Sequence, residues 1–385
     1  MKCYLDNAAT TKALPEVCEQ VVKIMSEDYG NPSSLHQKGL EAERYVKHAA
    51  EVIAKTLKCT PKNIIFTSGG TESNNMALIG TAFANQRKGK HIITTCFEHA
   101  SVHEPLIYLE SLGYEVTYLP VDNQGHIAPE ILREALREDT ILVSVMMINN
   151  EVGAILDVEA LSKVIKEFDK SIVFHVDAIQ AYGKMKIQPK KMGIDLMSVS
   201  GHKIHGPKGT GFLYRGENIK MHPYMHGGGQ QAGQRSGTEN VPGIAGLAKA
   251  AEIMEQTLEE RRNHLYDLKK HLIARVSEVP GTKVNACEKI EETAPHVVSV
   301  SFANVRSEVL LHALEEKGIF VSSGSACSSN HPGISGTLQA IGVAKELLDC
   351  TLRFSFSEYS SKEQIDYTIE CLKELVPILA RYTRR

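Results

Sequence analysis

Between residues 64 and 215 short apolar runs alternate with longer stretches of helical character, and this repetition restricts the fold more than any other feature. Most of the runs are apolar along their whole length, which is typical of strands buried on both faces. Such strands, separated by helices, form parallel sheets. The expected strands cover residues 64–68, 91–95, 115–121, 140–148, 171–177, 194–200 and 209–215. We therefore predict an α/β domain with a mainly parallel, seven-stranded sheet.

The C-terminal third has a different pattern. No Gly or Pro occurs between Gly246 and Pro280, and apolar residues recur there at helical spacing, which predicts one long helix joining two domains. Strands are expected at residues 297–302, 319–322 and 351–356, with helices at 307–317 and 361–381. This order predicts a smaller, compact α+β domain. We expect the large domain to span residues 16–258 and the smaller one to combine residues 1–15 and 259–385.

The composition is that of an ordinary soluble protein, since 42% of the 385 residues are hydrophobic, 23% are charged and the formal net charge is -3. This charge gives no reason to expect direct binding of nucleic acid. The N-terminus lacks the apolar segment of a signal peptide, and no apolar run is long enough to span a membrane. The 8 cysteines form neither closely spaced pairs nor a CxxC motif, so we expect free thiols in the reducing cytoplasm.

A Gly-rich turn follows the first expected strand, where residues 67–75 read Thr-Ser-Gly-Gly-Thr-Glu-Ser-Asn-Asn. Gly70 and Thr71 stand just before a helical stretch, and the N–H groups at a helix N-terminus favour an anion such as phosphate. The turn has neither the lysine of a P-loop nor the spacing of a dinucleotide fingerprint. By itself it is a weak signal.

Polar side chains also follow two later strands, at the sheet edge where ligands collect. Asp177 ends one strand, with Gln180 close behind it, and either caps the turn or pairs with a cation such as a protonated ring nitrogen. Lys203 follows the next strand, in a turn of small residues with Ser200 and His202. A partly desolvated lysine of this kind reacts with aldehydes, and its two neighbours can donate to phosphate.

His99 follows the expected strand at residues 91–95, and more than one role is open to it. It can cap the next helix, stack on a planar cofactor or carry protons near neutral pH. His103 lies four residues further on, where a metal pair would place it. Because no third ligand has a suitable spacing, we predict no metal site.

In chain order these parts are a phosphate turn, a histidine, an acid at a strand end and a lysine at the next strand end. Together they describe a site for pyridoxal 5'-phosphate (PLP), whose phosphate, ring and aldehyde each need one of them. Cys327 adds a candidate nucleophile, because it lies among Ser, Gly and Ala in residues 321–329, whereas the other cysteines lie in or beside apolar runs. Taken alone, this segment is equally well read as an ordinary polar turn.

Several motifs resemble those of cysteine desulfurases of the NifS/IscS type, and the resemblance extends over nearly the whole chain. They are residues 4–11 (Tyr-Leu-Asp-Asn-Ala-Ala-Thr-Thr), 67–74, 149–153 (Asn-Asn-Glu-Val-Gly), 200–203 (Ser-Gly-His-Lys), 235–238 (Arg-Ser-Gly-Thr) and 322–327 (Ser-Ser-Gly-Ser-Ala-Cys). The resemblance implies the α/β fold of fold type I PLP-dependent transferases, in the class V aminotransferase group. It also implies a homodimer with active sites at the subunit interface.

The same resemblance assigns a role to each site residue. The cofactor-binding residues would be Gly70, Thr71, His99, Asp177, Gln180, Ser200, His202, Lys203 and, from the other subunit, Thr238. Among them Lys203 would bind PLP covalently, Asp177 would pair with the ring nitrogen and His99 would stack on the ring. The substrate would be held by Asn150 and by the guanidinium of Arg353, which suits a carboxylate.

The implied reaction converts L-cysteine to L-alanine. Lys203 would remove the Cα proton, the Cys327 thiolate would attack the substrate sulfur to form a persulfide, and His99 would carry a proton. A sulfur-acceptor protein would take the sulfur, for iron–sulfur cluster assembly or tRNA thiolation, and the short C-terminus leaves scaffold docking open. The alternatives are a selenocysteine lyase, a class V aminotransferase and a cofactor-free scaffold.

Overall fold

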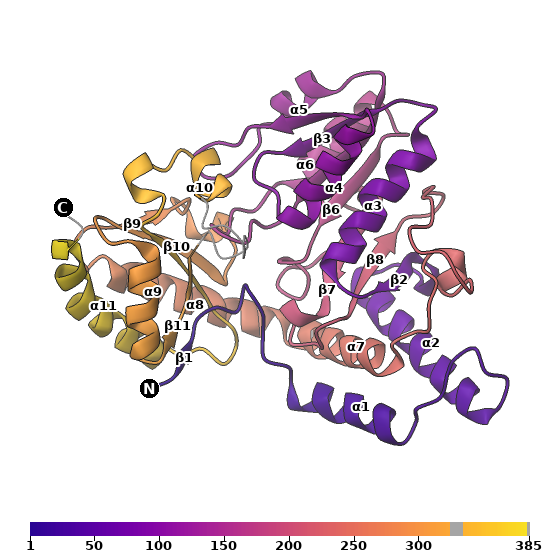
Figure 1. Cartoon of the computed structure of the whole chain (residues 1–385), viewed down its shortest axis with the longest axis horizontal. Helices are drawn as coiled ribbons and strands as arrows, with labels where there is room; N and C mark the ends of the chain where they lie inside the picture. The colour runs from indigo at the N-terminus through magenta and orange to yellow at the C-terminus, as the bar shows by residue number, and fades with distance from the viewer. Residues whose placement is uncertain (324–333, 383–385) are drawn as a thin grey trace.

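The computed structural model describes residues 1–323 and 334–382, so Cys327 lies outside the described residues. Figure 1 shows a large lobe around a twisted sheet and a smaller lobe beside it. The first strand, β1 (Cys3–Tyr4), and the last helix, α11 (Lys362–Tyr382), both belong to the smaller lobe. The chain therefore starts in this lobe, builds the large lobe and returns.

The large lobe is built on a sheet that has seven strands within the described residues, which confirms the predicted fold class. In order across the sheet the strands are β2 (Ile64–Thr67), β8 (Gly211–Arg215), β7 (Leu196–Ser200), β6 (Val173–Asp177), β5 (Thr140–Met146), β3 (His91–Thr95) and β4 (Glu115–Leu119). Among these strands β8 runs antiparallel to both of its neighbours, β2 and β7, and all the other neighbouring pairs are parallel. Residues 201–210 connect it to β7 and are fewer than the dozen or so that a parallel crossover needs.

Helices cover both faces of this sheet (Figure 1). One face carries α3 (Gly70–Asn85) and α4 (Ala100–Ser111), and the other carries α1 (Pro15–Ser26), α2 (Gln37–Leu57), α5 (Pro129–Ala135), α6 (Val158–Phe168) and α7 (Val241–Gln256). Neighbouring strand residues enter opposite cores: Ile92 packs with the α3 and α4 side chains, whereas Ile93 packs with those of the other face. This explains why the strands are apolar along their whole length.

The single long helix predicted between Gly246 and Pro280 is wrong. Two helices, α7 and α8 (Leu258–Val276), meet at Thr257, which has φ -110° and ψ 12°. The Thr257 hydroxyl donates to the Ile253 carbonyl (2.9 Å), and Arg261 Nη2 donates to the Met254 carbonyl (2.5 Å). Side-chain donors therefore satisfy the backbone carbonyls at a break that neither Gly nor Pro marks.

The smaller lobe has its own hydrophobic core and an antiparallel sheet. Its further elements are β9 (Thr282–Asn285), β10 (Val297–Phe302), α9 (Ser307–Glu316), β11 (Ile319–Phe320), β12 (Ser322–Ser323) and β13 (Thr351–Ser355), whereas α10 (Gly336–Ala340) packs through Leu338 on the core of the large lobe. The strand expected at residues 319–322 is two short strands, because β11 pairs with β1 and β12 pairs with β13. The division into residues 16–258 and the remainder stays a prediction.

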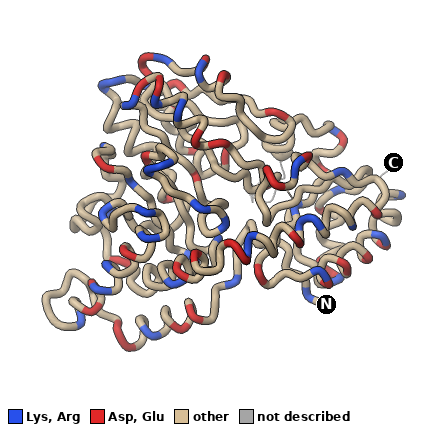
Figure 2. The backbone as a smooth tube through the Cα atoms, turned by 180° about the vertical axis from the view of Figure 1, so that it is seen from behind, with Lys and Arg blue, Asp and Glu red and all other residues tan. Residues whose placement is uncertain are grey.

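Short 3₁₀ turns lie at Pro61–Asn63, Gly201–Lys203, Gln231–Gly233, Ile290–Glu292 and Lys345–Leu347. Seen from behind, Lys and Arg residues are interspersed with Asp and Glu residues along both lobes (Figure 2). Among the described helices, none combines the length and the apolar character that crossing a membrane requires.

Candidate active site

Most of the predicted site residues line one cavity of about 270 Å³. It opens at the carboxyl ends of β5, β6 and β7, where Met146, Asp177 and Ser200 stand. The predicted residues that line it are Gly70, Thr71, His99, Asn150, Asp177, Gln180, Ser200, His202, Lys203 and Arg353. The structure thus brings together residues that lie far apart in the sequence, from Gly70 in the large lobe to Arg353 in the smaller lobe.

Two predicted residues are not in this group. Cys327 lies outside the described residues, so its position relative to the cavity stays a prediction. Thr238 is exposed and is not among the residues that line the cavity. A second hollow of about 740 Å³ adjoins the first, since both are lined by Thr71 and His99.

Asp177 ends β6 as a buried carboxyl group. Oδ2 accepts from Asn74 Nδ2 (2.9 Å) and Oδ1 accepts from the Ile179 N–H (2.9 Å). Burial raises the pKa of Asp177, and these hydrogen bonds offset only part of that effect. None of the ion pairs in the described part of the chain includes Asp177. A cation placed in the cavity would therefore stabilise its charged form.

His99 both caps a helix and faces the cavity, so the two sequence readings are compatible. At the N-terminus of α4 its Nδ1 accepts from the Ser101 N–H (3.0 Å). Because Nδ1 is an acceptor, the ring proton of the neutral imidazole is on Nε2. Burial lowers the pKa of His99, which favours this neutral form. The ring can then donate from Nε2.

The sequence reading missed Ser101 and Asn74, which connect the two residues just described. Asn74 Nδ2 donates to both Asp177 Oδ2 and Ser101 Oγ (2.9 Å each), and Ser101 Oγ lies 2.8 Å from His99 Nδ1. Both Asn74 and Ser101 are buried. The sequence shows only that an asparagine lies near the start of an expected helix. The fold shows that its amide is buried and which groups it bridges.

Lys203 ends the 3₁₀ turn that follows β7. Its Nζ donates to the carbonyls of Ala8 (2.5 Å) and Ala9 (2.6 Å), and Gln180 Nε2 also donates to Ala8 (2.9 Å). The N-terminal segment therefore passes along one side of the cavity. This accounts for the place of the motif at residues 4–11 in the site.

The other end of the cavity is formed by the N-terminus of α3 with Ser200 and His202. The first-turn N–H groups of a helix have no acceptor within the helix, so this end can hold an anion. Gly70 leaves room there for the Ile179 side chain, whose end would lie 2.1 Å from a Cβ at this position. Burial, followed by the charge of Lys203, lowers the pKa of His202 to about 4, so the ring is neutral.

Arg235 brings the motif at residues 235–238 to this helix end. Its Nε and Nη2 donate to the two carboxylate oxygens of Glu72 (2.7 and 3.2 Å). Burial would raise the pKa of Glu72, but the hydrogen bonds from Arg235 and Ser68 outweigh it and lower the value. The ion pair holds the chain beside the phosphate turn, while Thr238 remains exposed beyond it.

Arg353 enters the cavity from β13 in the smaller lobe. Nη1 donates to the Asn150 carbonyl (2.9 Å) and Nη2 to Asp6 Oδ1 (2.7 Å). Its buried Nε has no hydrogen-bond partner among the described residues. Asp6, which the sequence reading did not single out, thus orients the guanidinium and leaves a donor for a ligand.

These groups can be tested against the PLP that the sequence predicts. The cavity offers a buried carboxyl at Asp177 for a ring nitrogen and an amine at Lys203 for an aldehyde. It also offers the α3 N-terminus, with Ser200 and His202, for a phosphate. The donor set fits PLP.

Comparison with known proteins agrees with this geometry. The family model described as Aminotransferase class-V matches residues 3–368. The cysteine desulfurase IscS of Dictyoglomus turgidum is 44% identical over 374 residues, covering 97% of this chain and 94% of that protein. The cysteine desulfurase IscS of Methanosarcina thermophila is 43% identical over 373 residues, covering 97% and 91%.

The solved structures give the same result. A NifS-like protein superposes with a TM-score of 0.93 at 38% identity, covering 98% of this chain and all (100%) of its own. A NifS-like protein from Rickettsia africae superposes with a TM-score of 0.88 at 29% identity, covering 97% and 99%. The cavity, the family model and these relatives agree, and the chain belongs to the class-V aminotransferase family.

Proposed function

We propose that this chain is a PLP-dependent cysteine desulfurase that converts L-cysteine to L-alanine and retains the sulfur as a persulfide on Cys327. The observation that carries the proposal is the cavity in which Asp177, Lys203 and Arg353 meet. Relatives named cysteine desulfurase match 97% of the chain, which supports the same activity here.

When bound, PLP supplies an aldehyde and an electron-accepting ring. Asp177 acts as the counter-ion of the ring nitrogen, since its buried carboxyl needs a cation to stay charged. Lys203 would hold the cofactor, and its amine is the group that would take the Cα proton of the substrate. His99 lines the same cavity and would present its Nε2 proton to it.

Arg353 is the proposed ligand of the substrate carboxylate. Asp6 and the Asn150 carbonyl fix the guanidinium plane, so little conformational entropy is lost when the substrate binds. The unpartnered Nε gains a partner in the complex, and removing an unsatisfied buried donor is favourable. We propose that Asn150, which lies beside Arg353 in the lining of the cavity, also holds the amino acid.

Cys327 performs the sulfur transfer. Its thiolate attacks the substrate sulfur, an S–S bond forms as the C–S bond breaks, and the carbon that loses sulfur takes a proton to become the methyl group of alanine. No external oxidant is needed, because the substrate carbon takes up the electron pair of the broken bond. The balanced products are L-alanine and one persulfide.

We also propose that the enzyme is a homodimer. Large apolar side chains are exposed on α1 and on the segment that joins it to α2, namely Val22 (62%), Met25 (65%), Tyr29 (70%) and Leu35 (97%). Helix α1 lies at the margin of the molecule (Figure 1). A second copy would cover such a surface. Its Thr238 would then add a hydroxyl beside those of Thr71 and Ser200 in the cavity of the first chain.

The sulfur would pass from Cys327 to an acceptor protein in the cytoplasm, for iron–sulfur cluster assembly or tRNA thiolation. The cysteines found in the described residues are all free, as a reducing compartment requires.

The proposed activity is tested by incubating the PLP-loaded protein with L-cysteine and a thiol reductant. We expect equal amounts of alanine and sulfide from the wild type, and neither product from Lys203→Ala. A keto acid in place of alanine would identify an aminotransferase and overturn the proposal. Turnover of selenocysteine with none of cysteine would identify a selenocysteine lyase.

A further inference from the structure

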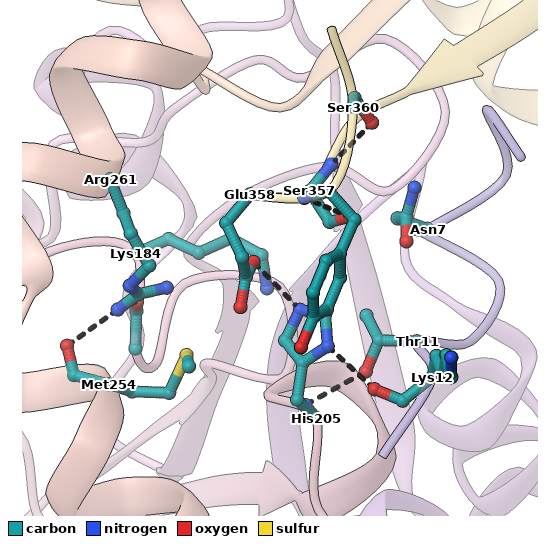
Figure 3. Close-up of polar contacts among 12 residues, drawn as sticks. Asn7, Thr11, Lys12, Lys184, His205, Met254, Arg261, Ser357, Glu358 and Ser360 are labelled. Carbon is teal, nitrogen blue, oxygen red and sulfur yellow. Dashed lines mark hydrogen bonds and ion pairs between the residues drawn. The ribbon is translucent and has the colours of Figure 1, made fainter. Parts of the chain in front are cut away.

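A second group of charged side chains lies next to Lys203 but outside the cofactor cavity. Lys184, His205, Arg261 and Glu358 line a small separate hollow, and Lys203 lines both this hollow and the cavity. Figure 3 shows these charged side chains converging from different segments of the chain. They come from the turns after β6 and β7, the start of α8 and the segment after β13. The reaction described above uses Lys203 but none of the other four side chains.

Lys184 contacts the main chain of Lys203. Its Nζ donates to the Lys203 carbonyl (3.0 Å). Gly183 makes this approach possible, because its φ is +74° and a Cβ there would lie 2.8 Å from the Ile204 side chain. Lys184 thus binds the main-chain carbonyl of Lys203, the residue whose amine takes part in the proposed reaction.

His205 fixes the exit of the same turn. It has a left-handed φ of 63°, and its N–H donates to Thr11 Oγ1 (2.8 Å). Its Nδ1 lies 2.7 Å from the Lys12 carbonyl and its Nε2 lies 3.0 Å from Glu358 Oε2 (Figure 3). Both ring nitrogens thus face acceptors, and although burial would raise the pKa of Glu358, its contact with His205 outweighs burial and lowers that pKa. The strained backbone is therefore held at three points.

Titratable groups face Lys184 from several segments, and they include His202 and His296, whose pKa values are lowered first by burial and then by lysine charges, that of Lys184 among them. Arg261 in α8 donates to the Gly183 carbonyl (2.9 Å), Lys203 lies in the next turn, and Glu358 is the acidic group. Burial, followed by the charges of Arg261 and Lys203, lowers the pKa of Lys184 to about 7, although Glu358 opposes this. The two lysines repel each other, so each makes the other harder to protonate.

We propose that Lys184 is a positioning residue for Lys203: it fixes the Lys203 main chain from outside the cavity, and its charge opposes protonation of the Lys203 nitrogen. The inference rests on the proposed function, in which that nitrogen holds PLP and must be unprotonated to take the Cα proton. A cationic neighbour is a known means of activating a lysine amine. The adjoining His205–Glu358 pair keeps the turn in register while Lys184 acts.

The test compares Lys184→Met, which removes donor and charge, with Lys184→Gln, which keeps a donor, and Lys184→Arg, which keeps both. The readouts are thermal unfolding, kcat, and the pH midpoint of the visible absorbance of lysine-bound PLP. We expect Met and Gln to raise that midpoint by about half a pH unit, because a repelling charge is lost. We expect kcat to fall about tenfold with Met, and Arg to restore both values toward wild type.

Lys166→Met is the control. Lys166 in α6 is also partly buried and also donates to a main-chain carbonyl, that of Ile172 (2.7 Å), but it pairs in addition with Asp195 Oδ2 (2.5 Å) and lies at the opposite end of β6. The Lys166→Met variant should have a lower unfolding temperature and an unchanged pH midpoint of the visible absorbance. If the Lys184 variants lose stability to the same extent and leave the midpoint unchanged, the inference is wrong.

If Lys184→Met does not fold, the comparison of Lys184→Gln with Lys184→Arg decides, since both keep a donor and only Arg keeps the charge. The two proposals fail separately in this experiment. Wild-type holoenzyme that makes no alanine would overturn the proposed function. Active wild type with normal midpoints in all Lys184 variants would overturn only the positioning role.

Discussion

At the scale of single residues, the site works because polar groups are placed where the fold has removed water. Asp177 is costly to bury, and two hydrogen bonds do not compensate that cost, so a cationic partner in the cavity is needed. Nδ1 of His99 accepts a hydrogen bond from the Ser101 N–H, so the ring proton is on Nε2. Arg353 is oriented by Asp6. His99 and Arg353 are thus set in one protonation state or one orientation before a ligand arrives, whereas the charged form of Asp177 is stabilised by the ligand.

The Arg353 assignment predicts a specific kinetic change. In Arg353→Lys the charge is kept but the planar fork is lost, and the Asp6 and Asn150 contacts cannot both be made. We expect KM for L-cysteine to rise about tenfold or more, as loss of a charged hydrogen bond implies, with a smaller change in kcat. Steady-state kinetics measure the split. An unchanged KM would show that another group binds the carboxylate.

At the scale of elements, the sheet is joined internally by buried side-chain contacts. His175 in β6 lies 2.8 Å from Ser144 of β5 through Nδ1 and 2.9 Å from Ser198 of β7 through Nε2. Burial lowers the pKa of His175 from 6.5 to about 3. The native ring is neutral while it bridges three strands.

This predicts how stability depends on pH. Between about pH 6.5 and pH 3 the unfolded chain binds a proton at His175 that the native chain does not, so stability is lost as pH falls through this window. The loss approaches about 1.4 kcal/mol per pH unit from this residue. In urea unfolding, the advantage of wild type over His175→Gln should therefore shrink between pH 7 and pH 5. The exposed His48→Gln control should track wild type, and parallel curves for His175→Gln would contradict the assignment.

The elements also show how far the sequence carries the prediction. The sheet strands were predictable because each is a continuous apolar run, and β6 and β7 end at Asp177 and Ser200 as expected. The break at Thr257 was not, since side-chain bonds rather than Gly or Pro produce it. Strand β1 was missed because its two residues become a strand only by pairing with β11.

The site shows the same division. Lys203 and Asp177 were predictable, because charged residues directly after buried strands are conspicuous in a sequence. Asn74, Ser101 and Asp6 were not, because their roles depend on partners that are distant in the chain. Local pattern thus predicts reactive groups better than it predicts the residues that orient them.

At the scale of the whole molecule, the two lobes contribute different parts of one site. The large lobe supplies the cofactor residues, whereas Arg353 comes from the smaller lobe. Thr238 lies on the surface of its own chain. The proposed dimer would place it in the partner's site and make each cavity complete only in the assembly.

Mixed dimers test this arrangement. Lys203→Ala removes the amine of one site, and Thr238→Glu places a negative charge where a phosphate would bind, so each variant alone should be nearly inactive. After subunit exchange, one site of each mixed dimer has both residues intact, and about a quarter of wild-type activity should return. Activity no greater than the sum of the separate variants would contradict a shared site.

The most direct measurement of the account is the mass of the peptide that contains Cys327 after one exposure of the PLP-loaded enzyme to L-cysteine without reductant. We predict that this peptide gains the mass of one sulfur atom, that alanine forms in equal amount, and that Cys327→Ser forms neither the persulfide nor alanine beyond background. Full alanine production by Cys327→Ser, or alanine formed with no sulfur on Cys327, would contradict the proposed reaction.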